Sequence, residues 1–245
     1  MSNYIITGAT SGIGEACTKT LASDDNRLII VGRNTDKLYD LKNKLPGEII
    51  PIEYDLNDLS NVGSLFEPCS KLGFKLDGMV YSAGIDSAWP VKVNNTSKMQ
   101  EIMTVNCFAF VEMCRYFYSK KNSADGSSIV AISSLASVLN EKGNCAYSMS
   151  KAALNSSIKT ISKEYIRRKI RVNAILPGGV NTPMGNSKGE LLASAKEENV
   201  NESPDEQPLG AMTGKDIADI VCFLLNPTGA FFTGELITVS GGRVH

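Results

Sequence analysis

Tyr147 and Lys151 are the two residues whose types and spacing point most directly to chemistry. They stand four residues apart in a stretch that reads as helix, so their side chains share one face. A tyrosine hydroxyl ordinarily has a pKa near ~10 and is a poor acid–base group at neutral pH. A neighbouring ammonium favours the phenolate, which moves such a tyrosine toward the working range. Ser133 and Ser134 end a predicted strand just upstream, where a hydroxyl could hold a substrate carbonyl oxygen.

A glycine-rich segment, Thr7-Gly8-Ala9-Thr10-Ser11-Gly12-Ile13-Gly14, follows the first apolar run directly. Glycines between a strand and a helix let the backbone approach a pyrophosphate, and the helix N-terminus offers free N–H groups there. Tight strand-to-helix turns also use glycine, but the position of this segment favours a dinucleotide-binding turn.

The second strand should end beside the adenine ribose of such a dinucleotide. Gly32-Arg33-Asn34 stands there, where an NAD-preferring site would place a carboxylate. A guanidinium cannot accept bonds from ribose hydroxyls, but it suits a 2′-phosphate. NADP(H) is therefore favoured over NAD(H). The alternative is a solvated arginine in a turn, and Asp36 lies too far along to replace the missing acceptor.

The elements that must position these residues are short apolar runs separated by amphipathic stretches. Such runs, alternating with helices, predict a parallel sheet that is covered on both faces. The predicted strands lie at 4–6, 28–31, 49–52, 79–81, 129–132, 172–176 and 236–239. The predicted helices lie at about 13–23, 35–45, 58–72, 97–120, 145–169 and 214–226. We expect an α/β fold, a single doubly wound Rossmann-type domain over 1–245 with a seven-stranded parallel sheet.

Composition and charge exclude several classes of protein. The 245 residues carry a net charge of −1, which gives no electrostatic case for nucleic acid or an anionic membrane. No apolar run approaches the roughly 18–20 residues that span a bilayer, and no secretory signal precedes the first strand. We therefore expect a cytoplasmic protein. The only histidine is His245, which excludes mechanisms that need an internal imidazole. The six cysteines lack paired spacing, so we expect no metal site and interpret them as small buried hydrophobes.

One long polar segment, 182–210, departs from the alternation of strands and helices. It follows the sixth strand, at the edge of the sheet where ligands bind in such folds, so we interpret it as a lid. A surface loop without function is the alternative. Met184, Leu191 and Leu192 could close over a substrate, and Ile85 and Trp89 could line its pocket; all five could equally be ordinary packing residues.

Taken together, these motifs resemble the short-chain dehydrogenase/reductase family from the first strand to the last. The glycine segment resembles the family's T-G-x-x-x-G-I-G motif, and Thr104-Val105-Asn106 carries an asparagine like that of the family's catalytic tetrad. Ser134 stands 13 residues before Tyr147, which favours it over Ser133. The resemblance implies that the catalytic residues are Asn106, Ser134, Tyr147 and Lys151.

The same resemblance implies a set of cofactor-binding residues along the carboxyl edge of the sheet. Asp55 and Leu56 would lie beside the adenine, and the segment from Asn173 to Thr182 resembles the family's nicotinamide cradle. The full set is Gly8, Thr10, Ser11, Gly12, Ile13, Gly14, Arg33, Asn34, Asp55, Leu56, Ser82, Ala83, Gly84, Tyr147, Lys151, Pro177, Gly178, Val180 and Thr182. Two departures are visible: Ser82 replaces the asparagine of the usual N-A-G, and Ser240 replaces an acidic residue before Gly-Gly.

The implied activity is NADPH-dependent reduction of a small-molecule carbonyl substrate, with Tyr147 donating the proton. Ser134 would bind the substrate oxygen, Lys151 would lower the pKa of Tyr147 and bind the nicotinamide ribose, and Asn106 would position Lys151 through a water. Two alternatives are a catalytically silent NADP-binding sensor and an NAD-dependent alcohol or sugar dehydrogenase.

Within the family the chain looks most like the 3-oxoacyl-(acyl-carrier-protein) reductases, whose substrate is carrier-bound. An acidic carrier would want a basic docking patch, and the compact cluster is Arg167, Arg168, Lys169 and Arg171. The alternative is that this cluster complements a helix C-terminus. The resemblance also implies a homotetramer or homodimer.

Overall fold

A seven-stranded parallel sheet forms the centre of the computed structural model, which describes residues 1–86, 89–184 and 207–243. The strands lie in the order β3-β2-β1-β4-β5-β6-β9, and every neighbouring pair is parallel. Their bounds are β1 Ser2–Thr7, β2 Asn26–Gly32, β3 Glu48–Glu53, β4 Leu76–Tyr81, β5 Ser123–Ile132, β6 Arg171–Pro177 and β9 Leu236–Val239. The predicted doubly wound Rossmann-type sheet is confirmed. The strand order reverses between β1 and β4, the position where ligands bind in such sheets.

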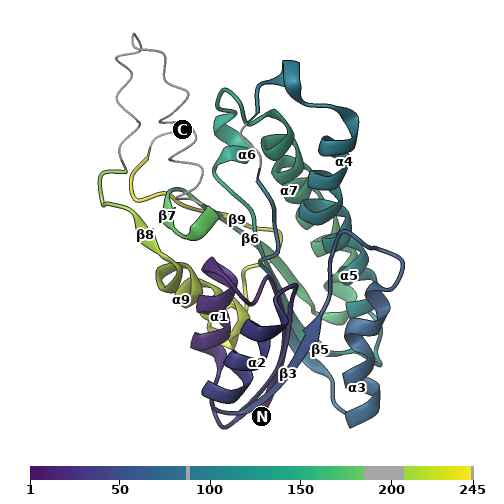
Figure 1. The fold of residues 1–245 in the computed structure, drawn as a ribbon. Helices are drawn as coiled ribbons and strands as arrows, with labels where there is room; N and C mark the ends of the chain where they lie inside the picture. Colours follow the sequence, from purple (N-terminus) through teal and green to yellow (C-terminus); the bar gives the residue numbers. More distant parts are fainter. Residues whose placement is uncertain (87–88, 185–206, 244–245) are drawn as a thin grey trace.

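Helices cover both faces of the sheet (Figure 1). One layer contains α1 (Gly12–Leu21), α2 (Thr35–Lys44) and α9 (Gly214–Leu225). The other contains α3 (Glu67–Leu72), α5 (Ala109–Phe117) and α7 (Cys145–Tyr165), with α4 (Thr96–Met103) and the short α6 (Ala136–Leu139) nearer the carboxyl ends of the strands.

The two layers explain why the strands read as continuous apolar runs. Successive side chains of a strand point to opposite faces: Tyr4 and Ile6 belong to the core under α1 and α9, whereas Ile5 belongs to the core under α5 and α7. Because both faces are covered, both sets of side chains must be apolar.

Three predicted helices differ in detail from the structure. The stretch 58–72 begins with a turn in which the Asp58 carboxylate accepts a hydrogen bond from the Ser60 N–H. A 3₁₀ turn, Val62–Phe66, follows before α3. The stretch 97–120 contains a π-helical segment, Thr104–Phe108, between α4 and α5. After α7 a 3₁₀ turn at Ile166–Arg168 ends at Lys169, whose φ is 55°.

Much of the expected lid, with Leu191 and Leu192, lies outside the described residues. On either side of that gap, β7 (Val180–Asn181) and β8 (Met212–Thr213) form a small parallel pair that the sequence did not predict. In the part of the chain that the structure describes, no helix is long and apolar enough to cross a membrane.

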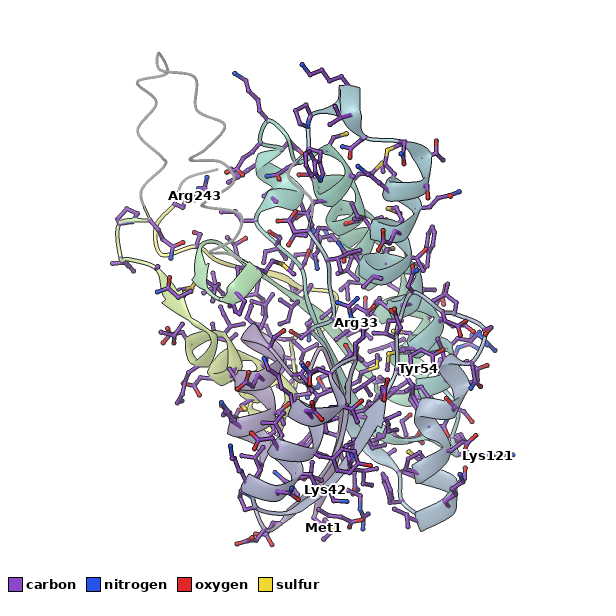
Figure 2. The ribbon with its side chains drawn as sticks, in the orientation of Figure 1. Met1, Arg33, Lys42, Tyr54, Lys121 and Arg243 are labelled. Carbon is purple, nitrogen blue, oxygen red and sulfur yellow. The ribbon has the colours of Figure 1, made fainter. Side chains whose placement is uncertain are left out.

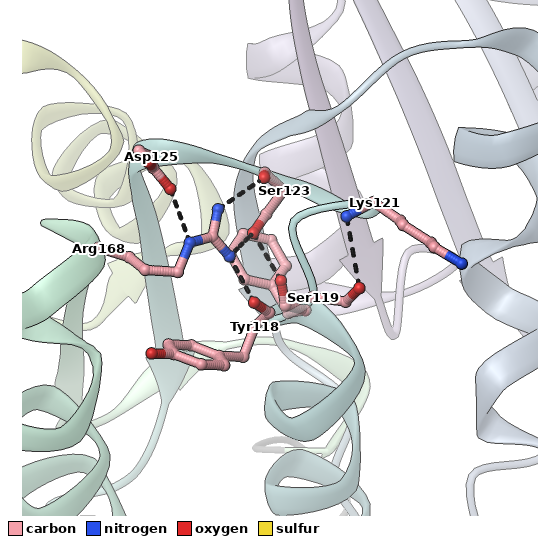
Figure 3. A network of polar contacts seen from close by, with 7 residues as sticks. Tyr118, Ser119, Lys121, Ser123, Asp125 and Arg168 are labelled. Carbon is pink, nitrogen blue, oxygen red and sulfur yellow. Dashed lines mark hydrogen bonds and ion pairs between the residues drawn. The ribbon is translucent and has the colours of Figure 1, made fainter.

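The basic cluster is not an exposed docking patch, because two of its four cations are buried. Arg168 bonds to Asp125, Ser123 and the Tyr118 carbonyl, whereas the Lys121 ammonium points away from this network (Figure 3). Arg171 donates to the carbonyls of Leu224, Leu225, Asn226 and Gly229. Arg171 therefore complements the C-terminus of α9, whereas Arg167, Arg168 and Lys169 follow the end of α7.

The interpretation of all six cysteines as buried hydrophobes is wrong at two positions. Cys145 is exposed and Cys222 is partly exposed. The other four are buried; burial raises the pKa of Cys69 to about 11 and that of Cys17 to about 12.

Candidate active site

Four side chains expected from the sequence come together above the carboxyl ends of β4 and β5. Tyr147 and Lys151 lie on the first two turns of α7, and both are buried. The Lys151 ammonium lies 5.7 Å from the centroid of the Tyr147 ring and donates a 2.9 Å bond to the Ile132 carbonyl at the end of β5. Ser134 follows that strand, and Asn106 reaches the site from the π-helical segment.

Burial controls the protonation of Lys151. It lowers the pKa of the ammonium to about 8, because the charged form loses water, while the charge of Asp86 acts in the opposite direction. Lys151 therefore keeps its proton at neutral pH, but it releases that proton at a lower pH than an exposed lysine does.

Burial also dominates the protonation of Tyr147. It raises the pKa of the phenol, the Asp86 charge raises it further, and a hydrogen bond with Ser134 lowers it. In the protein alone the direction is opposite to the one expected from Lys151. A phenol with a raised pKa holds its proton, which is the form that a proton donor needs.

Asn106 is fully buried, and its amide connects two segments of the chain. Its Oδ1 accepts a bond from the Ile85 N–H, and its Nδ2 donates to the Ile85 carbonyl and to Ser150 Oγ, at 2.8 to 2.9 Å. Ser150 in turn donates to the Tyr147 carbonyl. The direct link from Asn106 to α7 therefore runs through Ser150, and the water-mediated path to Lys151 stays a prediction.

The two candidate serines have different surroundings. Ser133 is buried, and its hydroxyl donates to Asn155 Oδ1 at 2.6 Å. Ser134 is partly exposed; its Oγ accepts a bond from the Ala136 N–H and shares a hydrogen bond with Tyr147. Ser134 is thus the serine that faces the tyrosine, as its spacing predicted.

The glycine-rich turn fits a dinucleotide pyrophosphate on three observations. Gly8 and Gly12 have φ values of +64° and +53°, which favour glycine. A Cβ on Gly14 would stand 2.2 Å from the Gly8 carbonyl oxygen. Ser11, the N-cap of α1, makes no side-chain capping bond, so the first-turn N–H groups are available to an anion.

The turn is tied to neighbouring segments of the expected cofactor site. Thr7 Oγ1 accepts bonds from the N–H groups of Ser82 and Ala83, both at 3.2 Å. A Cβ on Gly84 would stand within 3.4 Å of both Asn106 Oδ1 and Lys151 Nζ, so this glycine keeps open the space beside the buried ammonium. On the other side, a Cβ on Gly12 would contact Thr182.

Arg33 follows β2 with an exposed side chain, above Met1 and Lys42 in the view of Figure 2. Asn34 is the N-cap of α2, and its side chain accepts a bond from the Lys37 N–H. The Lys37 ammonium lies 3.4 Å from the Thr10 carbonyl oxygen. This second cation was missed in the sequence, although its place one turn after Arg33 could have indicated it.

The two residues predicted to lie beside the adenine follow the end of β3. Asp55 is exposed, and its Oδ1 accepts a bond from the Asn57 N–H, whereas Leu56 is buried.

The segment after β6 contains the residues predicted to cradle the nicotinamide. The Gly178 N–H donates to the Val239 carbonyl, and Gln207 bonds both backbone groups of Gly179. Asn173 is buried and bonds Phe232 and Glu235, so it anchors the strand rather than the cradle. Pro177, Gly178, Val180 and Thr182 remain candidates to line the cradle.

The possible pocket residues are placed only in part. Trp89 is 44% exposed, and the Lys98 ammonium lies over its ring. Met184 is 42% exposed, and Ile85 is fixed by Asn106. Asp86 follows Ile85 directly, and its charge acts on both Tyr147 and Lys151. This role was not predicted from the sequence.

This geometry defines a nicotinamide-dinucleotide oxidoreductase of the Rossmann type, and comparison with known proteins agrees. The family model described as "Enoyl-(Acyl carrier protein) reductase" matches residues 8–243. The chain belongs to the short-chain dehydrogenase/reductase family, whose members act on CH–OH groups with a nicotinamide cofactor.

Two curated relatives cover nearly the whole chain. Glucose 1-dehydrogenase of Gluconobacter oxydans is 30% identical over 97% of this chain and 90% of its own. A 3-oxoacyl-[acyl-carrier-protein] reductase of Thermotoga maritima is 29% identical over 98% of this chain and 96% of its own.

Three solved structures show the same fold over 100% of this chain. A short-chain dehydrogenase/reductase from Brucella melitensis, titled glucose/ribitol dehydrogenase, is 26% identical with a TM-score of 0.87 over 97% of its chain. A blue fluorescent protein from a metagenomic library, in complex with NADPH, is 25% identical with a TM-score of 0.85 over 98%. A 4-hydroxyisoleucine dehydrogenase complexed with NADH is 25% identical with a TM-score of 0.84 over 99%.

Proposed function

We propose that this protein is an NADPH-dependent reductase of a carbonyl substrate, with Tyr147 as the proton donor. The observation that supports it best is the convergence of Tyr147, Lys151, Ser134 and Asn106 above the strand ends, beside a glycine turn built for a pyrophosphate. The bound nicotinamide would supply the hydride.

The residues of the chain would supply the remaining chemistry. Tyr147 donates its phenolic proton to the substrate oxygen, and Ser134 donates a hydrogen bond to the same oxygen as negative charge develops there. Lys151, fixed through Ile132, stabilises the phenolate that Tyr147 leaves behind. Asn106 holds the segment at Ile85 against α7 and so keeps the wall of the site in place.

The preference for NADPH is supported by charge at the end of β2. Arg33 and Lys37 are two cations at the place expected for a 2′-phosphate, and neither is a carboxylate that would accept bonds from a ribose hydroxyl. The related structures include complexes with NADPH and with NADH, so they do not favour one cofactor for this chain. The proposed preference for NADPH therefore rests on Arg33 and Lys37.

The substrate class proposed is a small ketone or a 3-oxoacyl thioester, in line with the reductase relative. Since Arg168 and Arg171 are buried, the basic cluster gives no support to carrier docking at that point. A sugar or alcohol dehydrogenase is the second candidate, favoured by the glucose 1-dehydrogenase relative. The cytoplasmic location and the homo-oligomeric state stay predictions.

The test is cofactor oxidation by purified protein, with NADPH and NADH, against the N-acetylcysteamine thioester of acetoacetate and a panel of simple ketones. D-glucose with NADP⁺ or NAD⁺ serves as the oxidative arm. We expect turnover with NADPH and a loss of at least about 100-fold in kcat in Tyr147→Phe, with NADPH binding retained. Turnover that persists in Tyr147→Phe would remove the tyrosine from the mechanism, and turnover confined to glucose would favour the dehydrogenase.

A further inference from the structure

Asn155 extends the line of functional side chains on α7. Tyr147, Lys151 and Asn155 are spaced by four residues, so they lie on one stripe of the helix. Asn155 is only 7% exposed. A primary amide in the core destabilises the fold unless its donors and acceptor are bonded, so its partners indicate what it does.

The partners of Asn155 form a chain of hydrogen bonds that ends at Ser134. Ser133 Oγ donates to Asn155 Oδ1 at 2.6 Å, and Asn155 Nδ2 donates to Ser137 Oγ at 2.8 Å. Ser137 Oγ donates to the Ser134 carbonyl at 2.6 Å. Each serine hydroxyl has one proton to donate, and in this arrangement the hydroxyl protons of Ser133 and Ser137 each have an acceptor.

An apolar or purely accepting side chain at position 155 would interrupt this chain of hydrogen bonds. Without the Nδ2 donor, the Ser137 hydroxyl would lose one of its two bonds and the constraint on its rotation. The Ser134 turn also depends on Ser137 through its backbone, because the Ser137 N–H donates to the same Ser134 carbonyl at 3.1 Å. The Ala136 N–H donates to Ser134 Oγ at 3.1 Å, which leaves the hydroxyl proton to point away from the turn, toward Tyr147.

We propose that Asn155 is a positioning residue that acts through Ser133 and Ser137 to fix the turn carrying Ser134. It thereby sets the direction in which the Ser134 hydroxyl meets Tyr147 and the substrate oxygen. This role rests on the proposed function of the site, but it concerns a residue outside the tetrad.

The quantity that tests this role is the pKa of the Tyr147 phenol, which depends on the groups that face Tyr147. These are Lys151 on α7, Asp86 after β4 and Ser134 after β5. The hydrogen bond from Ser134 lowers the pKa of the phenol, whereas burial and Asp86 raise it. If the Ser134 turn loosens, that lowering contribution weakens and Tyr147 should lose its proton at higher pH.

The experiment compares Asn155→Leu, of similar size, with the smaller change Ser137→Ala. The control is Ser162→Ala, a buried serine farther along α7 that bonds within its own helix. The phenolate absorbance of Tyr147 is titrated in the NADP⁺ complex, as the difference between each protein and the same protein carrying Tyr147→Phe. Activity is measured as kcat and KM with the N-acetylcysteamine thioester of acetoacetate and NADPH.

We expect the titration midpoint of Tyr147 to rise by about 0.5–1 pH unit in both variants, the equivalent of one weakened hydrogen bond. We expect kcat to fall about tenfold with the NADPH dissociation constant within about twofold of wild type, since one donor is displaced rather than removed. The double variant should be no worse than Asn155→Leu alone, because both changes break one chain. Ser162→Ala should behave as wild type.

An unchanged Tyr147 midpoint in a folded Ser137→Ala protein would overturn the proposal, whatever happens to Asn155→Leu. A shifted midpoint in a protein without Tyr147-dependent turnover would uphold the positioning role and refute the proposed reductase. The two failures are therefore distinguishable.

Discussion

At the scale of single residues, Lys151 shows the conflict between stability and chemistry most clearly. Its ammonium is buried, and its pKa falls from 10.5 to about 8. Below about pH 8 the folded protein bears the full cost of holding this charge away from water. Between about pH 8 and 10.5 the folded protein releases the proton that the unfolded chain retains, so this cost declines as pH rises.

Lys151→Met should therefore stabilise the protein while it abolishes turnover. Removing a buried charge should raise the free energy of unfolding at pH 7 by up to roughly 3 kcal/mol, and the gain should vanish toward pH 10.5. Thermal melting of both proteins in the absence of cofactor, at neutral and at alkaline pH, measures this. A variant that melts lower than wild type at pH 7 would show that the buried ammonium of Lys151 does not destabilise the folded protein.

Arg33 is the residue on which cofactor choice is predicted to depend. Arg33→Ala removes a cation that can pair with a 2′-phosphate, and a charge-assisted bond of this kind contributes about 1.5–3 kcal/mol. KM for NADPH should rise about 10- to 100-fold, and KM for NADH should stay nearly constant. Lys42→Ala, at an exposed cation elsewhere on α2, is the matched control. An equal effect on both cofactors would show that Arg33 does not discriminate between them.

Resemblance to the family's motifs, more than spacing, predicted the tetrad, because only the i, i+4 geometry of Tyr147 and Lys151 is local. It was not enough to predict burial. The direction of the Tyr147 pKa depends on how much protein surrounds the phenol. The anchoring role of Asn173 depends on Phe232 and Glu235, which lie 59 and 62 residues later in the sequence. Likewise, nothing local shows which carbonyls Arg168 and Arg171 meet, so the sequence left both a docking patch and a helix C-terminus open for this cluster.

At the scale of elements, the π-helical segment between α4 and α5 was not predictable from periodicity. Thr104–Phe108 contains no glycine or proline that would mark an interruption of the predicted helix. Its wider turn places the Asn106 amide against both backbone groups of Ile85, and that contact is tertiary. Such segments are frequent at functional sites.

The C-terminal turn is joined to the start of the catalytic helix by an ion pair. The Arg243 guanidinium bonds Glu141, whose other oxygen accepts a 3.0 Å bond from the buried Asn144, the N-cap residue of α7. Tyr147 stands on the first turn of that helix. The pair therefore joins the last described residues of the chain to the segment that carries the proton donor.

Exchanging the two charges tests this connection. Glu141→Arg should lower kcat about three- to tenfold, because two cations then oppose each other and Asn144 loses its acceptor. Adding Arg243→Glu should bring much of that activity back, since paired changes in contact are not additive. Glu141→Gln, which keeps an acceptor for Asn144, separates the charge from the hydrogen bond. A double variant as impaired as Glu141→Arg alone would exclude the ion pair as the cause.

At the scale of the whole molecule, the fold class followed from the sequence because parallel strands buried on both faces leave continuous apolar runs. Seven such runs predicted seven strands. The pairing of β7 with β8 was not visible, because two-residue strands such as Val180–Asn181 have no pattern of their own. The structure of the polar segment between them stays a prediction over residues 185–206.

The packing of α1 against α9 has a consequence for how the protein is made. Cys17 and Leu21 of α1 share one apolar core with Ile217 and Val221 of α9, and a Cβ on Gly214 would stand 3.1 Å from that of Ala16. Helix α1 is thus covered by a helix, α9, that is translated much later in the chain. Synthesis proceeds at about 5–20 residues per second, so the growing chain exposes this apolar face for many seconds. Chains stalled before α9 should depend on chaperones that bind nascent apolar segments, and selective ribosome profiling with such a chaperone would show its occupancy falling once α9 emerges.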